Sequence, residues 1–283
     1  MRRMSDPLHD RIQEYYAAVP LLFAAAEDFG PLRLFVRGEP GAPYYGGPGH
    51  AQPTRRGAAR VGADDIARVR ARQRELGVPE AFEWLADAAP ALRALIEAAG
   101  LTVLKRPLMV LPAHRPLPAL PLPDGVTLRV LTADDPALPA ALALPRLAFA
   151  QQPGTGPADR AELSRLTREV TGDGTVAAVR PTLRAGHKTL LAALAPDGVP
   201  LAVGHYHPAA GATEIGGVGT LPSARRQGLA AAVTAALAAH AREHDIDTVF
   251  LAYAQESVAR IYARLGFRPA GTTLLIAGQP ARS

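Results

Sequence analysis

Residues 213–230 read TEIGGVGTLPSARRQGLA, the most informative segment of the C-terminal half. A strand enters a turn, and a long apolar-striped helix begins after Gly228. Several backbone N–H groups at a helix start lack partners, and the helix dipole adds positive potential there. Arg225 and Arg226 add charge, and Gly228 lets a ligand approach the backbone. The stretch predicts an anion site suited to a pyrophosphate; the alternative is a surface turn with solvated arginines.

Strands and helices alternate on both sides of this turn, which predicts a mixed α/β sheet. The strands are expected at residues 126–131, 188–195, 199–207, 213–220, 248–253 and 267–277. The helices are expected at residues 132–150, in part of 158–186, at 229–244 and at 257–265, with a loop at 151–157. Thr132 is expected to cap the first of these helices.

A second informative segment, residues 255–267, reads QESVARIYARLGF and follows an apolar strand. Together, the two segments resemble the GNAT N-acetyltransferases, whose cofactor loop reads R/Q-x-x-G-x-G/A and whose later helix reads N-x-x-A-x-x-x-Y-x-x-x-G-F. The matching residues are Arg225, Gly228 and Ala230 in the loop, and Tyr262, Gly266 and Phe267 in the helix. Gln255 and Val258 stand where the family has Asn and Ala, which leaves one contact to the cofactor or the neighbouring strand open.

The resemblance covers residues 126–277, and it implies a GNAT-like fold and an acetyl-CoA-dependent N-acetyltransferase. It also implies that the strand ending at residues 218–220 splays from residues 248–253, so that the pantetheine arm of CoA pairs with free backbone groups there. The implied cofactor-binding residues are Val218, Gly219, Thr220, Arg225, Arg226, Gln227, Gly228, Leu229, Ala230 and Gln255. A primary amine attacks the thioester directly, so neither a protein nucleophile nor a metal is expected.

Two proton-transfer tasks remain, because the ammonium must lose a proton and the leaving thiolate can take one. Tyr262 is the candidate acid, and its alternative role is that of a core aromatic. Glu214 is the candidate base; its alternative is a solvated carboxylate at a strand end. His205 and His207 also remain candidates, and they face the same side of their strand. No third ligand accompanies that pair, and His187, His240 and His244 carry no functional argument.

Composition narrows the class of protein. The chain has no cysteine, which excludes disulfides and thiolate chemistry. The net charge of +5 is spread out, with 16 basic and 13 acidic residues in 1–123 and 15 and 13 in 124–283. This distribution argues against nucleic-acid binding. No apolar run is long enough for a membrane span or a signal peptide, so a cytoplasmic location is expected. The acceptor amine, small-molecule or protein, stays open, as does homo-oligomerisation.

The prolines of residues 111–123 mark a seam, with five prolines in thirteen residues. We therefore expect an N-terminal α/β domain at residues 1–110, a linker at 111–125 and the GNAT domain at 126–283. In the first domain we expect helices at residues 6–29, 64–76 and 90–99, strands at 32–36, 81–85, 101–104 and 108–111, and a loop at 40–53.

The N-terminal half has two interpretations. Residues 64–111 repeat the element order of residues 229–277, which suggests a degenerate second GNAT fold without a cofactor loop, in which Ile96 or a neighbour replaces the tyrosine. The alternative is an unrelated α/β cap. Two other functions also stay open: an acyl-CoA-binding sensor or partner-binding protein without catalysis, and a nucleotide-binding protein. Against nucleotide binding, the sequence lacks an acidic residue at the usual spacing to bind the ribose.

Overall fold

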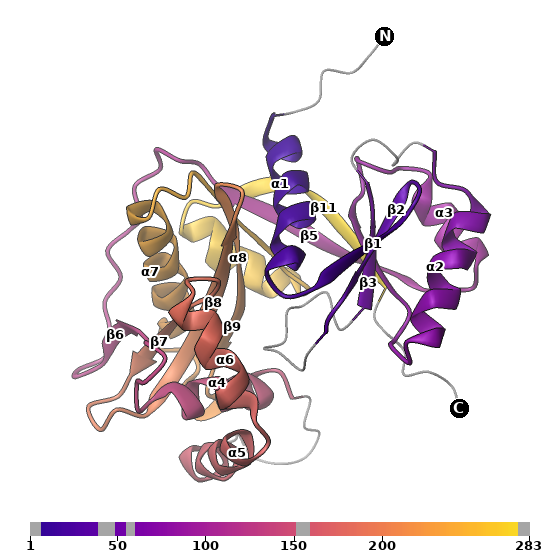
Figure 1. The fold of residues 1–283 in the computed structure, drawn as a ribbon. Coiled ribbons are helices and arrows are strands. Elements are labelled where there is room, and N and C mark those ends of the chain that lie inside the picture. The colour runs from indigo at the N-terminus through magenta and orange to yellow at the C-terminus, as the bar shows by residue number, and fades with distance from the viewer. Residues whose placement is uncertain (1–6, 39–48, 55–59, 151–158, 277–283) are drawn as a thin grey trace. The chain divides into compact units, whose positions relative to one another are not determined.

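The computed structural model describes residues 7–38, 49–54, 60–150 and 159–276 (Figure 1). The chain divides into two compact units, which are described separately. The first comprises Met1–Val110, Ala252–Glu256 and Pro269–Ser283, and the second comprises Leu111–Leu251 and Ser257–Arg268. Among the described helices, none is both long enough and apolar enough to cross a bilayer.

The first unit is a sheet with the strand order β1-β2-β3-β4-β11-β5. Its strands are β1 (Ala25–Phe29), β2 (Leu32–Val36), β3 (Gly49–Pro53), β4 (Ala81–Leu85), β5 (Val103–Leu111) and β11 (Arg268–Ile276). Its helices are α1 (Pro7–Ala18), the 3-10 turn η1 (Val19–Leu22), α2 (Ala63–Glu75) and α3 (Leu92–Ala98). Strands β3 and β4 run parallel, whereas β11 is antiparallel to β4.

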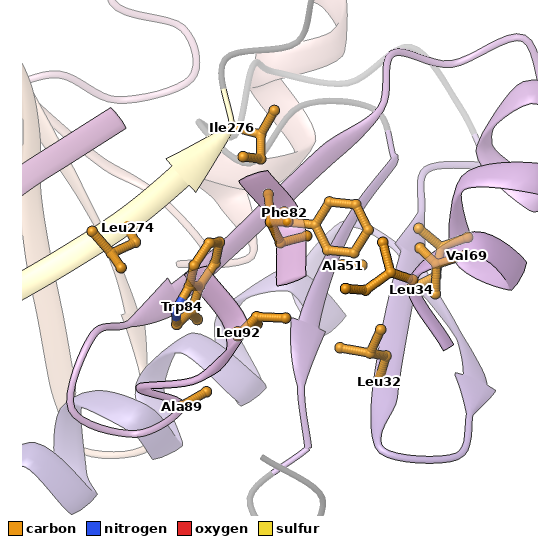
Figure 2. Packing of buried hydrophobic residues seen from close by; sticks show 12 residues of the cluster. Leu32, Leu34, Ala51, Val69, Phe82, Trp84, Ala89, Leu92, Leu274 and Ile276 are labelled. Carbon is orange, nitrogen blue, oxygen red and sulfur yellow. The ribbon is translucent and has the colours of Figure 1, made fainter. Parts of the chain in front are cut away.

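The core of this unit lies between the sheet and the helices α2 and α3 (Figure 2). Alternate residues of the strands, such as Leu32, Leu34 and Phe82, point into it together with Leu274 of β11. Burying a large aliphatic or aromatic side chain stabilises a fold by about 1.5–3 kcal/mol. The opposite face of the sheet contacts α1, where the Tyr16 hydroxyl lies 3.2 Å from the Thr273 hydroxyl.

Three sequence-based expectations for this unit are wrong. Residues 25–29 form strand β1 rather than helix, because Gly30 (φ +69°) closes a hairpin that pairs Phe29 with Leu32. Residues 49–53 form strand β3 rather than loop, and Gly49 is needed because a Cβ there would lie 2.6 Å from Val78.

The third error concerns the two short strands expected at residues 101–104 and 108–111. They form one strand, β5, which runs through Pro107. Proline has no N–H to donate, but it can still accept a hydrogen bond in a strand. At this position the Pro107 carbonyl accepts the Tyr253 N–H at 3.1 Å.

The second unit has the strand order β10-β9-β8-β7-β6. Its strands are β6 (Thr127–Val130), β7 (Thr189–Leu194), β8 (Pro200–Ala209), β9 (Ala212–Thr220) and β10 (Thr248–Ala252). Its helices are α4 (Leu138–Ala148), α5 (Arg160–Gly172), α6 (Thr175–Arg184), the 3-10 turn η3 (Pro222–Ala224), α7 (Leu229–Glu243) and α8 (Glu256–Arg264).

The two faces of this sheet pack against different helices. A Cβ on Gly204 of β8 would lie 2.9 Å from both Val233 and Leu237, so α7 covers one face closely. A Cβ on Gly219 of β9 would lie 2.7 Å from Ala148, so α4 covers the other face. Because side chains alternate along a strand, each residue of β8 and β9 can be assigned to the α7 face or to the α4 face.

The helix expected from Thr132 begins later than predicted, at Leu138. Residues 132–137 form turns instead, in which the Asp135 carboxylate accepts the Ala137 N–H at 2.8 Å. Local side-chain hydrogen bonds of this kind compete with helix formation. The loop expected at residues 151–157 lies outside the described residues.

Candidate functional site

The predicted anion turn lies between β9 and α7 and is open to solvent. Arg225, Arg226, Gln227 and Gly228 are all exposed, whereas Leu229 is buried and begins the helix. Gly228 is the N-cap residue with φ +78°, a left-handed conformation that favours glycine, and no side chain caps the helix. The first turn of α7 contains no acidic residue.

Two arginines flank this helix start in different ways. The Arg225 side chain donates to the Ala148 carbonyl at 2.9 Å, which ties the turn to the end of α4. Arg226 has φ +68°, a conformation that is uncommon for a residue with a Cβ. Backbone strain of this kind concentrates at ligand-binding loops. Ala230, the last residue of the motif, lies in the first turn of α7.

Strand β9 contains a β-bulge just before the turn. His205 of β8 pairs with Gly216 and Val203 pairs with Gly219, so two residues of β9 oppose one residue of β8. Gly217 lies in the bulge with φ +60°, and a Cβ there would lie 2.4 Å from the His205 ring. The bulge and the packing of His205 therefore explain Gly217, whereas the close approach of Ala148 explains Gly219.

The pairing between β9 and β10 ends early, as the resemblance implies. Residues Thr248–Phe250 of β10 pair with Ala212–Glu214 of β9, and no further residues of these two described strands pair with each other. Val218, Gly219 and Thr220 lie beyond that point, on the part of β9 that leads into the turn. The strand therefore has an edge beside the anion turn, and unpaired edges present N–H and C=O groups to a ligand.

Tyr262 occupies the last turn of α8. The N–H of Gly266 donates to the Ala263 carbonyl at 3.0 Å, and the N–H of Phe267 donates to the Tyr262 carbonyl at 3.1 Å. This is a Schellman motif, and Gly266 supplies its left-handed residue with φ +97°. Burial raises the pKa of the Tyr262 hydroxyl, so the phenol keeps its proton at neutral pH.

A group of polar side chains shares the α4 face of the sheet. His207 pairs with Glu214 across β8 and β9, and His205 is two residues away on the same side. Glu214 is 8% exposed and His207 is 4% exposed, so Glu214 is no solvated strand-end carboxylate. The His207 Nδ1 lies 2.8 Å from the His187 carbonyl, and the rings of His205 and His207 meet edge to face at 5.2 Å.

Lys188 was missed by the sequence analysis. It is 5% exposed, and its charge acts on His205. Burial, followed by the charges of Lys188 and His207, lowers the pKa of His205 well below 6.5. His205 is therefore neutral and a weak base at neutral pH. A signal was available, since Lys188 is one of two lysines in the chain and comes directly before strand β7.

Gln255 lies exposed in the short connection between β10 and α8. No hydrogen bond of its side chain is recorded among the described residues. The motif residue Val258 is half-buried in α8.

The first unit repeats the end of α8 at the end of α3. The N–H of Leu101 donates to the Ile96 carbonyl at 3.2 Å, and Gly100 has φ +81°. Ile96 therefore occupies the place that Tyr262 has in α8. Helix α2 differs from α7 at its start, because Asp64 and Asp65 lie in its first turn and Asp65 accepts the Gly62 N–H at 2.9 Å. These carboxylates oppose an anion at that helix start.

Comparisons with known proteins agree with this geometry. Residues 160–267 match the model of the Acetyltransferase (GNAT) family. A GCN5-related N-acetyltransferase from Kribbella flavida is 21% identical, with a TM-score of 0.70 over 99% of this chain and 98% of that one. One from Sphaerobacter thermophilus is 20% identical, with a TM-score of 0.56 over 89% and 84%.

A tandem GNAT protein from the clavulanic acid biosynthesis pathway is 17% identical, with a TM-score of 0.56 over 89% of this chain and 79% of that one. A search of curated proteins finds no significant match. At sequence identities this low, the similarity to these solved structures shows a common fold. It confirms the expected GNAT-like fold of the C-terminal half and extends the likeness to the N-terminal half.

Proposed function

We propose that the chain, whose residues 160–267 match the model of the acetyltransferase (GNAT) family, transfers the acyl group of acetyl-CoA directly to a primary amine. The observation that carries this proposal is the uncapped, acid-free start of α7 beside the free edge of β9.

The start of α7 supports pyrophosphate binding in three ways. Its first N–H groups have no intrahelical partner, and the helix dipole favours an anion there. Arg225 and Arg226 are exposed on the same turn. Gly228 leaves open space, because a Cβ at this position would meet no atom within 4 Å.

The edge of β9 supports binding of the pantetheine arm. The strand loses its β10 partner after Glu214, and the bulge at Gly217 redirects the backbone groups that follow. An extended amide-containing chain can pair with such an edge as an additional strand does. The acyl group would then lie near the bulge, on the sheet that carries Glu214.

The reaction forms a C–N bond between the amine and the acyl carbon and breaks the C–S bond of the thioester. We assign the ammonium proton to Glu214, directly or through water, because His205 is too weak a base at neutral pH. We assign the proton taken up by the leaving thiolate to Tyr262, which stays protonated at neutral pH. No protein nucleophile takes part in this scheme.

The first unit is proposed to bind no acyl-CoA. Asp64 and Asp65 place negative charge where the pyrophosphate would lie, and Ile96 offers no proton donor in the place of Tyr262. This leaves one site per chain.

The test is a mass-spectrometric screen in which the full chain, acetyl-CoA with an isotope-labelled acetyl group and a mixed pool of amines are incubated together. The proposal predicts labelled amides whose formation is abolished by Gly228→Asp. Tight CoA binding without any labelled amide, across amino acids, polyamines, aminoglycosides and peptides, would favour the sensor function instead.

A further inference from the structure

The end of α4 exposes a large aromatic side chain beside the strand that we propose to bind the cofactor. Phe149, the C-cap residue of α4, is 61% exposed, the highest value among the large hydrophobic side chains of the described residues. The leucines of the same helix are buried or half-buried: Leu138, Leu142, Leu144 and Leu147. A single exposed apolar residue needs no explanation, so any role for Phe149 has to come from its surroundings.

The Phe149 ring borders strand β9 at the point where β9 has lost its β10 neighbour. A Cβ on Gly219 would lie 3.8 Å from the ring carbon Cε2 of Phe149 and 2.7 Å from the Cβ of Ala148. Gly219 lies beyond Glu214, the last residue of β9 that pairs with β10. The missing side chain at Gly219 therefore lets α4 approach this edge of the sheet, and the aromatic ring lies beside the edge.

Hydrogen bonds hold the backbone that carries the ring. The Arg225 side chain, from the anion turn, donates to the carbonyl of Ala148, the residue directly before Phe149, at 2.9 Å. The N–H of Phe149 donates to the Pro145 carbonyl at 3.0 Å. The ring is therefore attached to a segment that is tied both to its own helix and to the anion turn.

We propose that Phe149 binds the pantetheine arm of CoA through apolar contact with its geminal dimethyl group. This inference rests on the proposed function, in which the pyrophosphate lies at the start of α7 and the arm follows the edge of β9 towards the bulge at Gly217. Gly219 lies between those two points. The ring therefore meets the part of the arm next to the pyrophosphate, where the geminal dimethyl group is the bulkiest apolar group.

This contact supplies a kind of recognition that the rest of the site lacks. The turn offers charge and N–H groups to the phosphates, and the strand edge offers N–H and C=O groups to the amides of the arm. Neither recognises the carbon skeleton of the arm. Covering the exposed ring with two methyl groups removes apolar surface from water, which favours binding. Phe149 thus distinguishes a ligand that carries the arm from a nucleotide that lacks it.

The test is calorimetric titration of the full chain with two ligands. One is CoA, and the other is 3′-phosphoadenosine 5′-diphosphate, which keeps the adenine, the ribose and the pyrophosphate but lacks the arm. Phe149→Ala should lower the affinity for CoA about tenfold, a loss typical of removing part of the burial of a phenylalanine. Its affinity for the nucleotide should equal that of the parent chain, and Phe149→Leu should recover most of the affinity for CoA.

Leu21→Ala is the matched control, because Leu21 is also an exposed apolar residue, at 51%, and lies in η1 of the first unit. It should bind both ligands as the parent chain does. Parent-like CoA affinity in Phe149→Ala would overturn the inference and leave the proposed function standing. An equal loss for both ligands would also overturn it, because the ring would then support the turn or the adenine. A parent chain that binds no CoA would contradict the proposed function itself.

A second measurement does not depend on the affinity for the nucleotide. Phe149→Trp adds a tryptophan to a chain whose own tryptophan, Trp84, is buried. The fluorescence emission of this variant should shift to shorter wavelength when CoA covers the ring. An unchanged emission spectrum at saturating CoA would overturn the inference.

Discussion

The backbone N–H of Phe267 donates to the carbonyl of Tyr262 at 3.1 Å, and their rings meet edge to face with centroids 6.1 Å apart. This is the hydrogen bond and the apolar contact that define a Schellman helix end. The residues of the Y-x-x-x-G-F pattern are therefore coupled: Gly266 permits the reversal of the chain, and Phe267 packs on Tyr262, the residue that we propose as the general acid.

Gly266→Ala should destabilise the chain and reduce turnover. The left-handed φ of +97° disfavours a Cβ, and the Cβ would lie 2.8 Å from the Arg115 Cγ. Such strain costs on the order of 1–3 kcal/mol. Gly100→Ala is the matched control, because Gly100 has φ +81° in the same motif but open space around it. It should lower the melting temperature less and leave turnover unchanged. If both variants lost turnover equally, the effect of Gly266→Ala would not come from the positioning of Tyr262.

Tyr262→Phe should slow acyl transfer with little effect on CoA affinity. The change removes a proton donor and almost no volume, and general acid catalysis contributes about 10²–10⁴-fold in rate. Because slow product release can hide a chemical defect, single-turnover rates are the measurement. A purely structural role would instead cost about 1 kcal/mol of stability and leave the rate intact. A parent-like single-turnover rate would remove Tyr262 from the mechanism.

Gly228→Asp should abolish CoA binding while the fold is kept. The added carboxylate lies at the helix start, where the pyrophosphate is proposed to bind, and like charges repel. Gly228→Asn is the matched control, since Asn has nearly the same shape, tolerates the left-handed conformation and adds no charge. Calorimetry should show a much larger loss of affinity for Asp than for Asn. Equal affinities in the two variants would place the phosphates elsewhere.

Stability should fall as the pH drops below 6.5. Burial, followed by the charge of Arg37, lowers the pKa of His50 to about 3, and that of His205 is also well below 6.5. Each histidine takes up a proton in the unfolded chain before it does so in the folded one. Folding stability is therefore full above pH 6.5 and is lost as the pH falls towards the folded pKa, by about 1.4 kcal/mol per pH unit for each histidine.

Melting temperatures between pH 7 and pH 5 check this prediction, since that window lies mostly above the titration of carboxylates. In His50→Gln, the free energy of unfolding should fall less steeply with decreasing pH, by about 1.4 kcal/mol per pH unit, because one proton fewer is taken up on unfolding. A slope identical to that of the parent chain would show that folding does not lower the pKa of His50.

The parts of the fold that follow local rules could be predicted from the sequence. The helix after Gly228, the apolar strand β10 and the stop at Gly266 depend on residues close together in the chain, and each lies within about a residue or two of its expected position. Strands β1 and β3 were missed because their stability comes from pairing with β2. The glycine, proline and alanine in these segments give no local sign of a strand.

For the candidate site, sequence patterns predicted the turn before α7, strand β9 and the position of Tyr262 near the end of a helix. They could not show that Glu214 and His207 pair across two strands, or that Lys188 is buried and acts on His205. Those relations depend on strand register.

We propose that the chain has one acyl-CoA site, at the start of α7. Calorimetric titration of the full chain with CoA measures the number of sites. We expect one molecule bound per chain, because Gly228 leaves the start of α7 uncapped whereas Asp64 and Asp65 occupy the start of α2. Two molecules per chain, or none at millimolar CoA, would contradict it.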